Sequence, residues 1–120
     1  TFIIGFKTDK EKKFTFPPKK EKLEFNMSDV FGGECSREIG FTLRVGGRGS
    51  NINDRRNWDS YLVDGIVKKL TPIEGLKMQG LPETFKLPVS NTQAMKQLGN
   101  SVAINAIKEV GRSMINYIKE

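Results

Sequence analysis

The sequence contains no histidine and only one cysteine, Cys35, among its 120 residues. Without histidine, the chain holds no Ser-His-Asp triad, no histidine general acid or base and no histidine-ligated metal. A single cysteine excludes an internal disulfide and a cysteine metal cluster, and we expect no metal site. If the protein is an enzyme, most of its chemistry must therefore lie outside these residues.

Apolar residues are also sparse, at 37% of the sequence against 28% charged residues. This is leaner than an ordinary globular domain and is typical of a domain that leans on a larger partner. No apolar run approaches the length of a membrane span, and no basic and hydrophobic leader opens the chain. We therefore expect a cytoplasmic protein without a membrane partner.

Positive charge is what the chain has in excess. The formal net charge is +6 and the isoelectric point is about 9.6. Such an excess favours polyanions, above all nucleic acid. Seven lysines against three acids lie between Lys7 and Lys22, around the Pro17-Pro18 pair. Because proline pairs favour extended backbone, this run is predicted to be an exposed connector.

The first 45 residues carry weak secondary-structure signals. Residues 1–6 form a β-rich apolar run that begins without methionine, so we expect a strand cut from a longer protein. Residues 24–39 show no clear period, apart from a turn at Gly32-Gly33. Residues 41–45 alternate as a strand does and lead into a glycine-rich loop at residues 46–50.

The second half of the chain has clearer punctuation. Residues 61–63 and 66–69 flank Asp64-Gly65, which predicts a tight β-hairpin. Thr71 and Glu74 have the spacing of a capping box, with proline at the first helical position, so a short helix is predicted there that ends at Gly80.

Two more helices are predicted before the end of the chain. A second capping box at residues 90–93 opens a helix that should stop at Gly99. The last helix is predicted to begin near Ser101, with Asn100 and Ser101 as suitable N-cap residues. Its apolar residues step by three or four positions along one stripe: Ala103, Ile107, Val110, Met114 and Ile118. The resulting fold class is α+β: a small, mostly antiparallel sheet with its loops, then short helices and a long C-terminal helix.

Three segments together resemble one family, the C5-cytosine DNA methyltransferases. Residues 69–74 (KLTPIE) and 78–82 (MQGLP) resemble its ninth conserved motif. Residues 93–102 (QAMKQLGNSV) resemble its tenth. Residues 2–6 (FIIGF) resemble the back half of its eighth, although the arginines that usually precede them are missing here.

The resemblance implies a division of the chain into three parts. Residues 1–23 would be the end of the eighth motif and a connector, residues 24–68 the target-recognition region, and residues 69–120 the ninth and tenth motifs with the C-terminal helix. The family's recognition region contains a Thr-Leu dipeptide before a glycine-rich loop, and Thr42-Leu43 stands before such a loop here. The variable stretch between residues 23 and 40 is short, so either the recognition domain is compact or residues have been removed.

The resemblance also implies an activity, the transfer of a methyl group from S-adenosylmethionine to carbon 5 of a cytosine flipped out of duplex DNA. The family's nucleophile is the cysteine of a Pro-Cys motif, whereas Cys35 follows Glu34. Cys35 is therefore not the nucleophile, and this chain has no catalytic residue and should be inactive alone. Its expected partners are double-stranded DNA and an N-terminal catalytic domain or subunit, in a restriction-modification system near the bacterial nucleoid.

Two sets of site residues follow from the resemblance. Asn100 and Ser101 are implied to contact the amino-acid end of S-adenosylmethionine, in a site that the N-terminal domain completes. Arginine reads guanine in the major groove, and glycines allow close backbone approach. The candidate DNA-binding residues are Thr42, Leu43, Arg44, Gly46, Gly47, Arg48, Arg55, Arg56 and Asn57.

Two other classes of function remain open. A stand-alone basic DNA-binding module without catalysis would explain the charge and the glycine-rich loop. A structural or regulatory protein that binds a partner through the C-terminal helix would explain the apolar stripe. Neither accounts for the ninth and tenth motifs.

Overall fold

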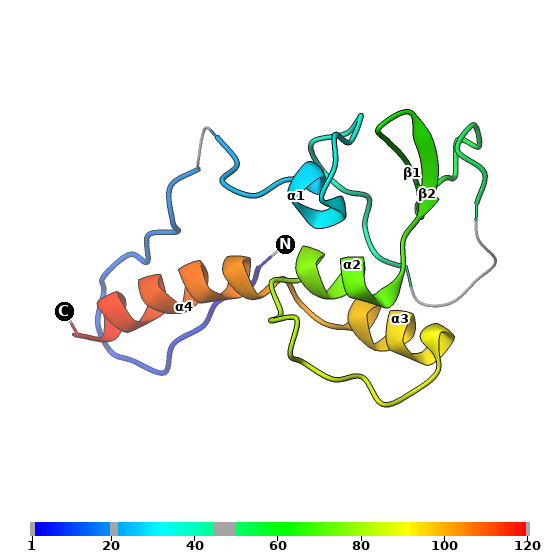
Figure 1. Cartoon of the computed structure of the whole chain (residues 1–120). Helices are drawn as coiled ribbons and strands as arrows, with labels where there is room; N and C mark the ends of the chain where they lie inside the picture. The colour runs from blue at the N-terminus through cyan, green and yellow to red at the C-terminus, as the bar shows by residue number, and fades with distance from the viewer. Residues whose placement is uncertain (1, 20–21, 45–49, 120) are drawn as a thin grey trace.

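The computed structural model describes residues 2–19, 22–44 and 50–119 and confirms the α+β class (Figure 1). A two-stranded antiparallel sheet is surrounded by short helices, and one long helix lies apart from them. In chain order the elements are α1 (Met27–Phe31), β1 (Ser60–Val63), β2 (Ile66–Lys69), α2 (Pro72–Met78), α3 (Asn91–Asn100) and α4 (Ile104–Lys119). Among the described residues, no helix is long and apolar enough to cross a membrane.

The predicted hairpin is confirmed. Strands β1 and β2 pair with Val63 opposite Ile66 and Ser60 opposite Lys69. The connection needs two residues with positive φ, and Asp64 (51°) and Gly65 (77°) supply them. This is the turn that Asp-Gly favours, because its twist matches that of the flanking strands.

Helix α1 lies in the stretch that the sequence left unassigned. Asn26 caps it by accepting hydrogen bonds from the backbone N–H groups of Ser28 and Asp29, at 3.0 and 3.3 Å. The Asp29 carboxylate accepts in return from Asn26 N at 2.9 Å. Gly32 ends the helix in the left-handed conformation, with φ of 68°. The predicted turn at Gly32 is therefore a helix C-cap.

Helices α2 and α3 form where they are predicted. Glu74 Oε2 accepts from the N–H of the N-cap residue Thr71 at 3.0 Å, and Pro72 occupies the first turn. Ser90 caps α3 through its hydroxyl, which accepts from Gln93 N at 3.3 Å. A Cβ built on Gly75 of α2 would lie 2.9 Å from Leu98 Cδ1 of α3. Glycine at this position therefore lets the two helices approach closely.

One hydrophobic core joins α1, the hairpin, α2 and α3. Tyr61, Val63 and Leu98 are its most deeply buried large side chains. Met27 and Val30 of α1, together with Leu43, Leu70 and Leu76, complete the buried cluster. Helix α4 contributes no residue to this cluster.

Two strand predictions are wrong. Neither residues 2–6 nor residues 41–44 form a strand, since no strand pairs with them in the described part of the chain. Phe41 N instead donates to the Tyr61 hydroxyl at 2.8 Å. An alternating pattern alone does not provide the neighbouring strand that a ladder requires.

The predicted start of the last helix near Ser101 is also wrong. Helix α3 continues to Asn100, Ser101 is extended with ψ of 176°, and α4 begins at Ile104. The Ser101 hydroxyl donates to Leu98 O at 2.7 Å. A serine hydroxyl that bonds a carbonyl three residues earlier competes with the helical backbone, which breaks the helix here.

Helix α4 packs mainly against the N-terminal segment. The Phe6 ring stacks on Tyr117 with centroids 4.2 Å apart, and Phe14 lies edge-on to Tyr117 at 6.1 Å. The exposed fractions of Ile107 and Ile118 are 42% and 63%, so part of the predicted apolar stripe faces outward. The radius of gyration is 17.4 Å, whereas a compact globule of this length has about 14 Å. The chain is therefore a compact core with an extension (Figure 1).

We expect Gly75→Ala to be less stable than Gly111→Ala by about 1–2 kcal/mol, because overpacking a core costs about 1–3 kcal/mol and exceeds the gain in helix propensity. A Cβ on Gly111 of α4 meets no atom within 4 Å, so the Gly111→Ala variant gains helix propensity without a packing cost. Urea unfolding followed by Trp58 fluorescence measures both. Equal stabilities would show that Leu98 moves aside without cost.

Candidate functional site

The segment that follows the glycine-rich stretch is tied to the start of the hairpin. Asp59 is only 6% exposed, and its Oδ1 accepts from Ser50 N at 2.9 Å and from Ser50 Oγ at 2.6 Å. Ser60, 1% exposed, donates its hydroxyl to Ser50 O at 2.7 Å. Residues 50–59 therefore close into a loop whose two ends meet at β1.

Asn57 is part of this closure. Its Nδ2 donates to Ser60 O at 2.8 Å, and its Oδ1 accepts from Ser60 N at 2.9 Å. The Ser50 hydroxyl also lies 2.8 Å from Asn57 Oδ1. Both the nitrogen and the oxygen of the Asn57 amide are thus hydrogen-bonded within the loop. Asn57 therefore stabilises the loop, and few of its polar groups are left to bond a DNA base.

The candidate arginines in the described residues face outward. Arg44, Arg55 and Arg56 are all exposed. The Arg56 backbone N–H donates to Asp54 Oδ1 at 2.8 Å, which fixes the turn and leaves its guanidinium at the surface. Gly46, Gly47 and Arg48 lie outside the described residues.

Thr42 and Leu43 have different environments. Leu43 is 9% exposed and belongs to the core, whereas Thr42 is exposed. The bond from Phe41 N to the Tyr61 hydroxyl fixes the segment just before them. Burial raises the pKa of Tyr61 above 10.0, so the neutral phenol is favoured in the folded chain. Leu43 therefore anchors the segment, and Thr42 is the member of the pair that a ligand can reach.

Asn100 and Ser101 lie at the C-terminal end of α3, not at the start of the last helix. Both are exposed. The Leu98 carbonyl accepts from Ser101 N at 3.2 Å, from Ser101 Oγ at 2.7 Å and from Gln79 Nε2 at 2.8 Å. Because the Ser101 hydroxyl has one hydrogen and donates it to this carbonyl, the oxygen can only accept a hydrogen bond from a ligand.

A small hollow joins two of the predicted sets. Its volume is about 210 Å³, and its walls include Thr42 and Leu43 on one side and Gly99 and Ser101 on the other. Gln79 also lines this hollow. The structure thus brings the Thr-Leu pair next to Gly99 and Ser101. Arg55, Arg56 and Asn57 do not line this hollow.

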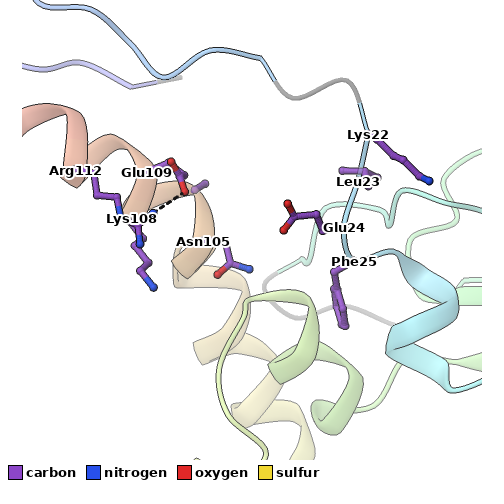
Figure 2. A pocket seen from close by; sticks show the side chains of 9 residues that line it. Lys22, Leu23, Glu24, Phe25, Asn105, Lys108, Glu109 and Arg112 are labelled. Carbon is purple, nitrogen blue, oxygen red and sulfur yellow. Dashed lines mark hydrogen bonds and ion pairs between the residues drawn. The ribbon is translucent and has the colours of Figure 1, made fainter.

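A second hollow lies between residues 22–25 and α4. Figure 2 shows Lys22, Glu24 and Phe25 on one side of it and Lys108 and Arg112 on the other. Its volume is about 530 Å³. Glu109 in its wall pairs with Arg112 at 3.4 Å. Because acids and bases are mixed here, this hollow has no clear preference for a polyanion.

Cys35 has a structural position. Its backbone forms a bridge with Val63 along the outer edge of β1, and its N–H donates to Ser28 Oγ at 3.0 Å. Its side chain is half-buried and packs against the core. Within the described residues, no histidine, cysteine or acidic side chains gather into a metal-binding group.

Comparison with known proteins establishes the class. Residues 36–116 match the family model described as C-5 cytosine-specific DNA methylase, and the chain belongs to this family. The match contains the hairpin and helices α2 and α3.

Individual relatives agree with this assignment. The chain is 43% identical over 112 residues to the Type II methyltransferase M.HpaII of Haemophilus parainfluenzae, covering 82% of this chain and 31% of the relative. It is 43% identical over 53 residues to M1.ScrFI of Lactococcus lactis subsp. cremoris, covering 44% of this chain and 14% of the relative. With M.DsaV of Dactylococcopsis salina, it shares 47% identity over 49 residues, covering 41% and 14%. The chain thus spans less than a third of the length of these relatives, and no solved structure matches it.

We expect Asp59→Ala to destabilise the fold by about 2 kcal/mol, because it leaves the Ser50 N–H without its buried, charged acceptor. Asp54→Ala is the matched control, since Asp54 is exposed and its carboxylate accepts from Arg56 N in the same loop. Urea unfolding measures the difference, and hydrogen exchange at Ser50 N should accelerate only in the Asp59 variant. Equal effects at the two positions would contradict the closing role of Asp59.

Proposed function

We propose that this chain is the C-terminal DNA-recognition portion of a DNA (cytosine-5-)-methyltransferase of a restriction-modification system. The complete enzyme would transfer a methyl group from S-adenosylmethionine to carbon 5 of a cytosine in a specific duplex site. The observation that carries the proposal is the family match over residues 36–116 in a chain that spans 31% of M.HpaII. The relatives are named Type II methyltransferases, which supports the restriction-modification context.

On this proposal, the methyl-transfer chemistry belongs to the rest of the enzyme. The family's reaction uses a cysteine thiolate as nucleophile. The only cysteine in the sequence is Cys35. Its backbone bridge to Val63 and its packing against the core give it a structural role. The isolated chain therefore transfers no methyl group by itself.

The catalytic domain, fused or as a separate subunit, would cover the exposed side of α4. Ile107, Ile115 and Ile118 are 42%, 53% and 63% exposed along this helix. Burial of apolar area of this kind stabilises an interface by about 25 cal/mol per Å². The N-terminal segment covers Tyr117 through the ring of Phe6.

The DNA would lie at the other end of the molecule, beside Arg44 and residues 50–59 (Figure 1). Arg55 and Arg56 are exposed on the loop 50–59 that Asp59 and Ser60 hold closed, and Arg44 is exposed as well. A rigid loop that presents guanidinium groups suits bidentate bonds to guanine. Asn57 would support this loop rather than read a base. Gly46, Gly47 and Arg48 remain candidates from the sequence.

The cofactor would contact the turn after α3. The Ser101 oxygen is an acceptor only, so its partner would be the ammonium group of S-adenosylmethionine rather than the carboxylate. The Asn100 side chain is exposed and offers both a donor and an acceptor. The residues present thus fit the amino-acid end of the cofactor, which would supply the methyl group.

DNA recognition is tested by comparing arginines with lysines in the complete enzyme. Arg55→Ala and Arg56→Ala should reduce discrimination between the cognate site and a one-base variant by about 1–3 kcal/mol where the contact is bidentate to guanine. Lys10→Ala and Lys13→Ala are the controls, and each should at most weaken binding to both sites alike, with about one unit less slope of log affinity against log salt per lost phosphate contact. Affinities at several salt concentrations provide the measurement. If the arginine variants weaken both sites equally, residues 44–59 do not set specificity.

The cofactor contact is tested by Asn100→Ala and Ser101→Ala. Loss of a hydrogen bond to a charged group costs about 1.5–3 kcal/mol, so we expect about a tenfold or larger rise in the Kd for S-adenosylmethionine. DNA affinity should change less. Thr92→Ala, which alters an exposed residue of the same helix, is the control. A lower melting temperature with unchanged cofactor affinity would limit both residues to a structural role.

A further inference from the structure

Gln79 is bonded to both ends of the turn between α3 and α4. Its side-chain Nε2 donates to Leu98 O at 2.8 Å, near the end of α3. Its backbone carbonyl accepts from Ile104 N at 2.9 Å, at the first residue of α4. The last carbonyls of a helix and the first N–H groups of the next lack partners within their own helices. One residue of the ninth motif thus satisfies a group on each side of Ser101.

Gln79 is itself held in place. It follows α2 directly, and its N–H donates to Gly75 O at 3.1 Å. Gly80, the next residue, has a φ of 76°, a conformation that favours glycine and turns the chain away. A Cβ on Gly80 would lie 3.5 Å from the Asn105 side chain, so α4 begins close beside this turn.

Gln79 and Ser101 share one acceptor. The Leu98 carbonyl receives the Ser101 hydroxyl and the Gln79 amide together. The amide fixes where that carbonyl lies, and the carbonyl fixes the rotamer of Ser101. Gln79 also lines the hollow with Thr42 and Ser101, and the bond to Leu98 occupies one of the two N–H groups of its amide.

We propose that Gln79 is a positioning residue for cofactor binding, which acts by orienting the Ser101 hydroxyl through the Leu98 carbonyl. This inference rests on the proposed function, because it assumes that Ser101 faces S-adenosylmethionine. A residue of the segment that resembles the ninth motif would thus shape the turn at Ser101, in the segment that resembles the tenth.

The test uses Gln79→Met and Gln79→Glu in the complete methyltransferase, with S-adenosylmethionine as the probe. Methionine keeps the length of the side chain without a donor, and glutamate replaces the donor with a second acceptor that Leu98 O repels. We expect about a fivefold rise in cofactor Kd for Gln79→Met, as for the loss of one neutral hydrogen bond, and a larger rise for Gln79→Glu. The discrimination between DNA sites should not change in either variant.

A double variant separates positioning from general stability. If Gln79 acts through Ser101, Gln79→Met combined with Ser101→Ala should bind the cofactor no more weakly than Ser101→Ala alone. Asp59→Ala, which destabilises the fold away from this turn, should lower the melting temperature without changing cofactor Kd. An unchanged Kd in both Gln79 variants, or additive losses in the double variant, would overturn the inference.

The Ser101→Ala control shows which proposal has failed. If Ser101→Ala weakens cofactor binding and the Gln79 variants do not, only the positioning role of Gln79 is lost. If neither position affects cofactor binding, the assignment of the turn to S-adenosylmethionine is lost as well.

Discussion

The close packing of α2 against α3 is the contact on which the rest of the arrangement depends. Gly75 has no side chain, and Leu98 packs against its backbone. A Cβ at position 75 would lie only 2.9 Å from Leu98 Cδ1. This approach brings Gln79, just past the end of α2, within 2.8 Å of the Leu98 carbonyl at the end of α3. A bulkier contact would separate the helices and remove that bond. The geometry of the turn at Ser101 is thus a consequence of a glycine twenty-six residues earlier in the chain.

The hairpin connects this helix pair to the surface loops. Leu70 N donates to Asp59 O at 2.7 Å, so the end of β2 is tied to the residue that also closes the loop at Ser50. Tyr61 of β1 is 1% exposed and holds Phe41 through its hydroxyl. The segments on either side of the glycine-rich stretch are therefore both attached to β1. Displacement of either segment would break hydrogen bonds of buried groups, so these bonds hold both flanks of the stretch against β1.

The elements with local signals could be predicted from the sequence, and those that depend on distant partners could not. Asp64-Gly65 and the Thr71–Glu74 box determine their own backbone, so the hairpin and α2 form as predicted. Helix α1 was missed, although Asn26 and Asp29 form the same kind of reciprocal cap, because asparagine and aspartate are less typical of it. Among the DNA-binding candidates, Asn57 follows from its residue type and Leu43 from the resemblance. The hydrogen bonds of Asn57 and the burial of Leu43 arise from tertiary contacts with Ser60 and the core, which neither signal contains.

Helix α4 forms although its apolar residues are only partly buried. Its sixteen residues supply their own backbone hydrogen bonds, and Phe6 covers Tyr117. Ile107, Ile115 and Ile118 on the same helix stay 42%, 53% and 63% exposed. Exposed apolar area costs free energy in water, so a chain with this surface is more stable when another body buries it. Helix α4 starts at the turn that Gln79 holds. A catalytic domain that docks on the exposed residues of α4 would therefore also be placed relative to Ser101. On the proposed function, docking of α4 and formation of the cofactor site would then be one event.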